Sequence, residues 1–230
     1  MVHCSGRPLL LLCCGLLLFS ALATAASDPD AFPRAFTAAQ QAMQQGKFVD
    51  AEIAYRQALA AMEQEHDAKA PALLTVLNPL ADCYRAQKKY AEAADTLTRA
   101  LTIEETRSGT ASPQLLAVLG RLAALYQAKG DGPTWETTLR RMLAILDAAP
   151  AVRAQALPGV LAQLAECQVT QGKLTDAEAT YRRCVTMAED AHGAERAHCI
   201  APLLQLAGFF VAQKRFPDAE TTLTRALTIW

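Results

Sequence analysis

The side chains that could support catalysis or metal binding are few and scattered. After residue 26 the chain contains three histidines and four cysteines, namely His66, His192, His198, Cys83, Cys167, Cys184 and Cys199. His192, His198 and Cys199 are close in sequence and could be proposed as metal ligands, but histidines near a turn are more often simply exposed. The chain has no glycine-rich phosphate loop, GxSxG motif or HExxH motif. We therefore predict no catalytic centre, no metal site and no cofactor.

Composition narrows the class of fold and partner. The 230 residues are 52% hydrophobic and only 6% aromatic, and most of the apolar residues are Ala and Leu, which favour helices. The alternating apolar and polar stretches typical of half-buried strands are missing. The formal net charge is −1 and no basic block is present, which argues against nucleic-acid binding. These features predict an all-α protein.

Residues 1–25 have the three-part composition of a secretory signal peptide. His3 and Arg7 give a short positive start, an apolar run follows at 9–22, and Ala23 and Ala25 fit the small-residue cleavage rule. The run is short for a membrane span. We expect cleavage after Ala25 and export to the periplasm or the exterior, with an uncleaved membrane anchor as the alternative. Residues 26–34 are predicted to be a lead-in to a repeat domain at 35–230.

A single period organises that domain. Rows of similar residues lie 42 apart, for example Phe48, Tyr90, Gly132, Leu174 and Phe216. The segments LADCY at 80–84, LAALY at 122–126 and LAECQ at 164–168 repeat in the same register. Each unit is predicted to hold two helices, a leading one with apolar residues at helical spacing and a trailing one that starts at the Phe48 row. Because one hairpin cannot bury its apolar face alone, five units must stack into a solenoid.

The repeated residues resemble a known repeat family. The second unit matches the signature of the tetratricopeptide repeat at Leu77, Leu80, Ala81, Tyr84, Ala93, Leu97 and Ala100. The longer unit and the segments VLNPLADCY and DTLTRALTIEE are similar to the kinesin-light-chain variety of that repeat. The resemblance covers about residues 35–230 and implies a right-handed solenoid of antiparallel helical hairpins. It also implies a non-enzymatic scaffold that holds an extended segment of a partner protein in its concave groove.

Candidate binding residues follow from projecting the groove positions of that family onto this chain. They are Thr75, Asn78, Asp82 and Arg85 in unit two, Arg121, Gln127, Gln163 and Glu166 in units three and four, and Gln205 in unit five. The set is polar and mixed in sign, and it contains no carboxylate clamp shared by all units. We expect a protein or peptide partner, no nucleic acid, and no membrane contact beyond the signal segment.

Two further interpretations stay open. The fifth unit would expose Leu227, Ile229 and Trp230, which suggests a self-associating module or a fragment of a longer array. Cys184 and Cys199 are predicted on helices that pack together across a turn, so they could form a disulfide after export. They also occupy rows held by Ala and Leu in other units, which favours buried core thiols.

Overall fold

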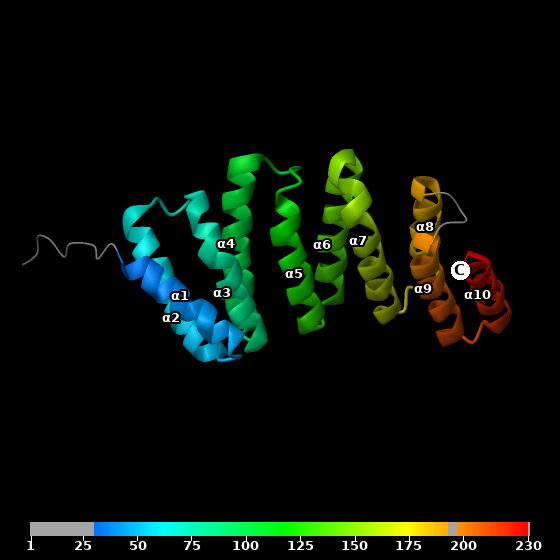
Figure 1. Ribbon diagram of the computed structural model, residues 1–230, viewed down its shortest axis with the longest axis horizontal. Coiled ribbons are helices and arrows are strands. Elements are labelled where there is room, and N and C mark those ends of the chain that lie inside the picture. Colours follow the sequence, from blue (N-terminus) through cyan, green and yellow to red (C-terminus); the bar gives the residue numbers. More distant parts are fainter. Residues whose placement is uncertain (1–29, 193–196, 230) are drawn as a thin grey trace, which may run out of the picture.

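The computed structural model describes residues 30–192 and 197–229, and this part of the chain consists of ten α-helices and two short 3-10 helices (Figure 1). The α-helices are α1 (Ala31–Gln44), α2 (Phe48–Glu65), α3 (Leu74–Ala86), α4 (Tyr90–Ser108), α5 (Leu115–Lys129), α6 (Gly132–Ala148), α7 (Pro150–Thr170), α8 (Leu174–His192), α9 (Ile200–Ala212) and α10 (Phe216–Ile229). The 3-10 helices η1 (Pro71–Leu73) and η2 (Ala197–Cys199) lead into α3 and α9. The predicted signal peptide lies outside the described residues, and α1 begins within the predicted lead-in.

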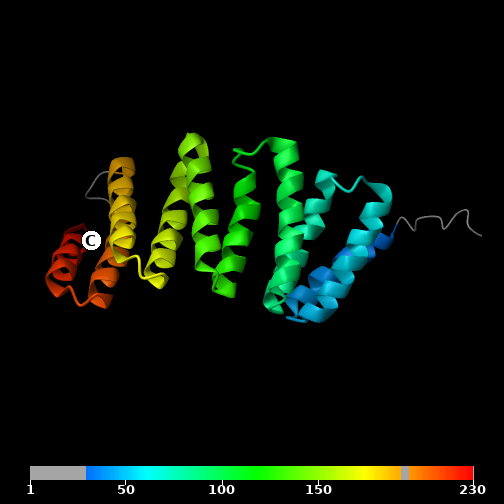
Figure 2. The same cartoon turned by 180° about the vertical axis from the view of Figure 1, so that it is seen from behind.

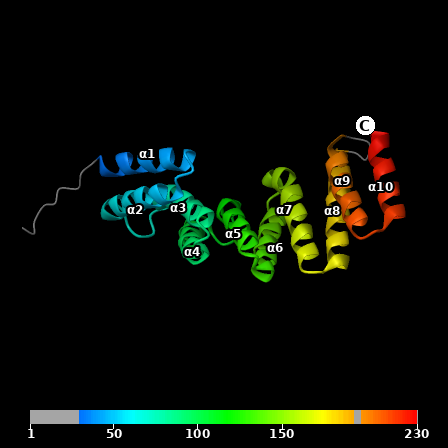
Figure 3. The ribbon, with the colours of Figure 1, turned by 90° about the horizontal axis from the view of Figure 1, so that it is seen from below.

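The helices pair into five hairpins, which we number as units 1 to 5, from α1–α2 to α9–α10. The units lie side by side along the long axis of the molecule, with α1 near one end and α10 at the other (Figures 1 and 2). Seen from below, α1 and α2 lie across the view whereas α8 to α10 run upright, so the array twists along its length (Figure 3). The predicted all-α array of five antiparallel hairpins is confirmed.

The turn inside each hairpin explains why the register is so regular. The trailing helices begin at the five residues of the Phe48 row, 42 apart. Each is preceded by a residue in the left-handed conformation, which is Gly in units 1, 3 and 4 but Lys88 (φ 60°) in unit 2 and Lys214 (φ 58°) in unit 5. In every turn an N–H bonds to the carbonyl five residues earlier, as from Lys47 to Ala42 at 2.9 Å. This bond is the mark of a Schellman helix end.

Alanine rows let the two helices of a hairpin approach closely. Ala39, Ala81, Ala123, Ala165 and Ala207 on the leading helices are all at most 1% exposed. They face Ala51, Ala93, Ala177 and Ala219 on the trailing helices, which are at most 3% exposed. In unit 3 the small residue is replaced by Trp135, whose indole is buried and whose Nε1 has no hydrogen-bond partner. Even there the trailing helix starts in register, at Gly132.

The buried apolar side chains form two clusters instead of one. The larger cluster extends from Ala39 in unit 1 to Cys184 in unit 4. The smaller cluster packs unit 5 against α8 and includes Ala177, Val185 and Phe210. The two clusters therefore meet within unit 4, because the buried leucines of α7 belong to the larger cluster and Ala177 and Val185 of α8 to the smaller one.

Ion pairs also connect successive units. Arg99, Arg141, Arg183 and Arg225 on the trailing helices bind Glu63, Glu105, Asp147 and Glu189, respectively, on the preceding trailing helix. The sequence separation within each pair is 36, and the pairs recur once per repeat. Because these side chains are partly exposed, each pair contributes only about 0–1 kcal/mol. Their main effect is to fix the register of one trailing helix on the next.

A second, more buried set of ion pairs connects trailing helices to the following hairpin turn. Glu52 binds Lys89, Glu136 binds Lys173 and Glu178 binds Arg215, at 2.6, 2.6 and 2.5 Å. At the equivalent positions between units 2 and 3 the sequence has Ala94 and Asp131. Both partners are thus replaced at that one interface, and Asp131 instead caps α6 by accepting from the Thr134 N–H at 3.3 Å.

Candidate functional site

The predicted binding residues lie on the leading helices α3, α5, α7 and α9. Neighbouring leading helices face one another, because Arg121 of α5 binds Asp82 of α3 and the Gln127 amide of α5 donates to Glu166 of α7 at 3.2 Å. We call the surface formed by these helices the leading-helix face. It spans units 2 to 5, so side chains that are distant in sequence form one continuous surface.

The part of this face in unit 2 is already engaged internally. The Asp82 carboxylate lies between two arginines, with Arg121 bound to it and Arg85 at 3.8 Å. Thr75 is exposed, but its hydroxyl donates to the carbonyl of Ala72 at 2.7 Å. Asn78 is half-buried, and its Oδ1 is buried without a hydrogen-bond partner. Of these four residues, Arg85 and Thr75 therefore present the most accessible polar surface.

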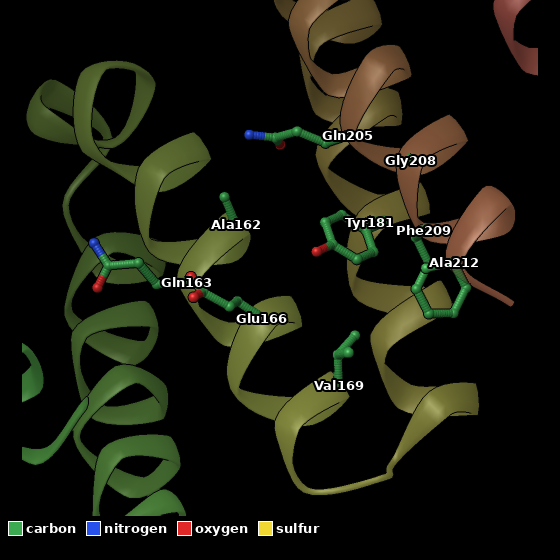
Figure 4. Close-up of a pocket in the computed structure, with 9 residues that line it drawn as sticks. All are labelled: Ala162, Gln163, Glu166, Val169, Tyr181, Gln205, Gly208, Phe209 and Ala212. Atoms are coloured by element: carbon green, nitrogen blue, oxygen red, sulfur yellow. The ribbon is translucent and has the colours of Figure 1, made fainter. Parts of the chain in front are cut away.

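Units 4 and 5 enclose a hollow of about 400 Å³ on the same face. Its walls come from α7, α8 and α9, and the lining residues are Ala162, Gln163, Glu166, Val169, Tyr181, Gln205, Gly208, Phe209 and Ala212. Three of them, Gln163, Glu166 and Gln205, are predicted binding residues. Figure 4 shows the Tyr181 ring on α8 with Phe209 on α9 beside it, while the Glu166 side chain extends from α7 toward the side of Gln163. The structure thus brings the C-terminal third of the predicted set together around an apolar floor.

The aromatic floor of this hollow is well defined. The rings of Tyr181 and Phe209 have centroids 5.5 Å apart and are tilted by 41°. Burial raises the pKa of the Tyr181 hydroxyl, and the nearby charge of Glu166 raises it further. Tyr181 is therefore a neutral hydrogen-bonding group at ordinary pH, on the edge of an apolar surface.

The floor residues were not among the sequence candidates, although a signal for them exists. Phe209 stands in the row of Cys83, Leu125 and Cys167, where it is the one aromatic residue. Tyr181 stands in a row otherwise held by Leu97, Leu139, Leu223 and another tyrosine. A comparison of the rows for outlying aromatic residues marks Phe209, as it also marks Trp135 in unit 3.

The thiols and histidines do not form a reactive centre in the described part of the chain. Within residues 30–192 and 197–229 no group of three His, Cys, Asp or Glu side chains could hold a metal ion. Burial raises the pKa of the Cys83 thiol to about 11, and burial also raises the pKa values of Cys167 and Cys184. Thiols with raised pKa values are poor nucleophiles.

The possible Cys184–Cys199 disulfide is not formed in this structure. Cys184 is a buried thiol whose Sγ donates to the carbonyl of Pro158 at 3.8 Å, and Cys199 is also buried. The disulfide stays a prediction for the oxidised protein.

Helical hairpins stacked in register, with an open polar face on their leading helices, define a helical repeat scaffold. The tetratricopeptide repeat family model matches residues 33–106 and 157–230. These segments make up more than half of the chain, so the chain belongs to the tetratricopeptide repeat family. Such repeats are typical of protein–protein interaction scaffolds, and the family is generally non-enzymatic.

Solved structures with the same fold include kinesin-light-chain-like proteins. The kinesin light chain nearly identical TPR-like repeats of Podosopora anserina align with a TM-score of 0.72 at 22% identity, over 87% of this chain and 95% of that chain. BtubC from P. vanneervenii aligns with a TM-score of 0.66 at 21% identity, over 83% and 76% of the two chains. YrrB, described as a TPR protein with an unusual peptide-binding site, aligns with a TM-score of 0.51 at 16% identity, over 92% and 91%. No curated protein sequence matches the chain.

In the described residues no helix has both the length and the apolar character required to cross a membrane.

Proposed function

We propose that this protein is an exported, non-enzymatic scaffold that binds an extended segment of a partner protein on its leading-helix face. The observation that carries the proposal is the hollow between α7 and α9, where a polar rim surrounds an apolar floor. A concave site with an apolar floor and a few convergent polar groups is the usual form of a ligand site.

An extended segment fits this face better than a folded domain edge. Packed helices are about 8–10 Å apart and an extended chain advances about 3.3 Å per residue, so roughly three residues of a partner would cross each unit. A segment of about ten residues would then reach from Arg85 in unit 2 to Gln205 in unit 5. The side chains along that path are polar and mostly exposed, which suits hydrogen bonding to a peptide backbone.

Selection of random decapeptides against the purified protein would test this proposal. Peptides selected on the wild type should bind Arg85→Glu at least ten times more weakly, because Arg85 lies on the leading-helix face. Lys47→Glu makes the same change of charge at an exposed turn residue away from that face and should leave binding unchanged. Equal loss or equal retention in the two variants would refute the assignment of the face.

Export is proposed from the composition of residues 1–25. Mass spectrometry of the protein recovered from the native host should find a chain that begins after Ala25, outside the cytoplasm. A recovered chain that still carries residues 1–25 would contradict cleavage.

Self-association is the second candidate function, and the surface of α10 favours it. Leu227 is 75% exposed and Leu223 is 38% exposed, whereas Leu143 and Leu139, their equivalents in unit 3, are 7% and 0% exposed. An exposed apolar stripe of this kind often marks a protein contact. Sedimentation velocity of the wild type and of Leu227→Glu would show whether the stripe mediates a dimer that the charge abolishes.

A further inference from the structure

Two acidic residues, Asp82 on α3 and Glu166 on α7, occupy the same repeat position two units apart. Asp82 is bound by Arg121, which comes from the next leading helix. The residue two repeats after Arg121 is Gln205. The repeat therefore places the cation Arg121 opposite Asp82 between units 2 and 3. Between units 4 and 5 it places the neutral amide of Gln205 opposite Glu166.

Glu166 consequently keeps an uncompensated negative charge. Among the described residues its carboxylate accepts one hydrogen bond, from the neutral Gln127 amide at 3.2 Å, and takes part in no ion pair. The Glu166 side chain is exposed at the rim of the hollow, and Figure 4 shows it extending toward the side of Gln163, so that rotation of this side chain is needed to bring its carboxylate over the hollow. The space next to it is open, because a Cβ built at Gly208 would meet nothing within 4 Å.

The shape and the chemistry of the hollow suit one kind of side chain. A guanidinium can bind a carboxylate through two parallel hydrogen bonds and can also stack on aromatic rings. Both kinds of partner line the hollow, since Glu166 belongs to its rim and the Tyr181 and Phe209 rings to its floor. The same unit already shows such a contact, with the Arg215 guanidinium 4.5 Å from the ring centroid of Phe210.

We propose that the hollow between α7 and α9 binds an arginine side chain of the partner. This arginine would pair with Glu166 as Arg121 pairs with Asp82. This proposal rests on the proposed function, because it assigns a specificity pocket to the leading-helix face. Arginine is preferred over lysine because an ammonium forms no bidentate pair and stacks less well on aromatic rings. A neutral side chain of the same shape leaves the carboxylate unpaired.

The first experiment uses small probes and does not depend on a peptide partner. N-acetyl-arginine methylamide and its neutral isostere N-acetyl-citrulline methylamide are titrated into ¹⁵N-labelled protein. The arginine probe should shift the amide signals of Gly208 and Gln205 and bind at least ten times more tightly than citrulline. Equal binding of the two probes, or shifts confined to other units, overturns the proposal.

The second experiment places the cation on the protein itself. Gln205→Arg should form the ion pair with Glu166 internally, keep or raise the Tm, and abolish the preference for the arginine probe. Thr37→Arg adds the same charge at the equivalent exposed position of unit 1 and should keep the preference. If Gln205→Arg folds and retains the tenfold preference, the pocket is not at Glu166.

The third experiment separates this pocket from the proposed function. Decapeptides selected from a random library should contain arginine at one position on the wild type and lose that requirement on Glu166→Gln. Peptides that bind the leading-helix face without any arginine requirement refute the pocket but keep the scaffold function. Specific binding of the arginine probe with no selected peptide supports the pocket and refutes the extended-segment function.

Discussion

Replacing Glu136 by Gln removes one charge from the contact between units 3 and 4. The carboxylate is only 9% exposed and accepts four hydrogen bonds. Its Oε1 accepts from Arg140 Nη2 at 2.7 Å and from Arg140 Nε at 3.0 Å. Its Oε2 accepts from Lys173 at 2.6 Å and from Gln171 at 3.1 Å. A Gln side chain has the same shape but only one acceptor oxygen, so either the Arg140 or the Lys173 contact is lost.

The size of the effect follows from these contacts. Hydrogen bonds to charged groups contribute about 1.5–3 kcal/mol each, compared with about 1 kcal/mol for neutral ones. The cations can rehydrate, because Lys173 and Arg140 are 43% and 57% exposed. We therefore expect a loss of about 2 kcal/mol in the free energy of unfolding, not the sum of all four bonds. In a chain of this length that corresponds to a fall in Tm of about 4–8 °C.

The dependence on pH gives an independent check. The bond from Lys173 is the main cause that holds the pKa of Glu136 below its ordinary value of 4.5. A lowered pKa in the folded state contributes stability that is complete above the unfolded value and is lost as the pH falls through the folded value. The difference between wild type and Glu136→Gln should thus be full near pH 7 and shrink as the pH falls below the ordinary value of 4.5.

Urea unfolding followed by circular dichroism, once near pH 7 and once at a pH well below 4.5, measures this difference. Glu166→Gln is the matched control, because the exposed Glu166 accepts one hydrogen bond from a neutral amide, and its stability should change by less than about 0.5 kcal/mol. A Glu136→Gln variant as stable as the control near pH 7, or one equally destabilised at both pH values, would refute the reasoning.

Three further outcomes are expected. Lys88→Gly should raise the free energy of unfolding by about 1 kcal/mol in urea, because Lys88 has a φ of 60° that glycine adopts without strain. Gly208→Ala and Gly159→Ala should each raise the Tm, because both glycines are in helices with open space for a Cβ, and alanine stabilises a helix by roughly 0.5–1 kcal/mol relative to glycine. Binding of the arginine probe should weaken in Gly208→Ala alone. Amide hydrogen exchange should be faster in residues 197–229 than in α3 to α6, because unit 5 packs through the smaller apolar cluster.

The order of the helices was accessible from the sequence because a single period controls it. Each hairpin turn must adopt a left-handed residue at the same position, so the trailing helices all begin at the same point of the repeat. The leading helices are less constrained at their starts. α7 begins at Pro150, one residue after α6 ends at Ala148, whereas α5 follows a longer connection from α4. A proline at the first position of a helix is favourable, but local patterns do not specify how many residues such a connection needs.

The candidate site was predictable as a face but not as a set of contacts. Asp82 and Arg121 were both expected to face a partner, and the structure pairs them with each other. That pairing depends on the distance between two helices, which the amphipathic pattern does not encode. The hollow is harder still to predict, because it arises where Ala162, Gly208 and Ala212 leave space unfilled. Small residues at such positions do not change the helical periodicity, so the pattern does not reveal the hollow.

The departures from the repeat show at which interface the acid of a leading helix is paired with a cation and at which it is not. Between units 2 and 3 the acid of the leading helix is neutralised internally by Arg121, and the second ion pair is removed at both partners, Ala94 and Asp131. Between units 4 and 5 the acid Glu166 has no such cation among the described residues, and its one hydrogen bond comes from the neutral Gln127 amide. Because the same repeat positions are neutralised by Arg121 in one interface and carry the neutral Gln205 in the other, we expect a partner that carries a cation to bind at units 4 and 5.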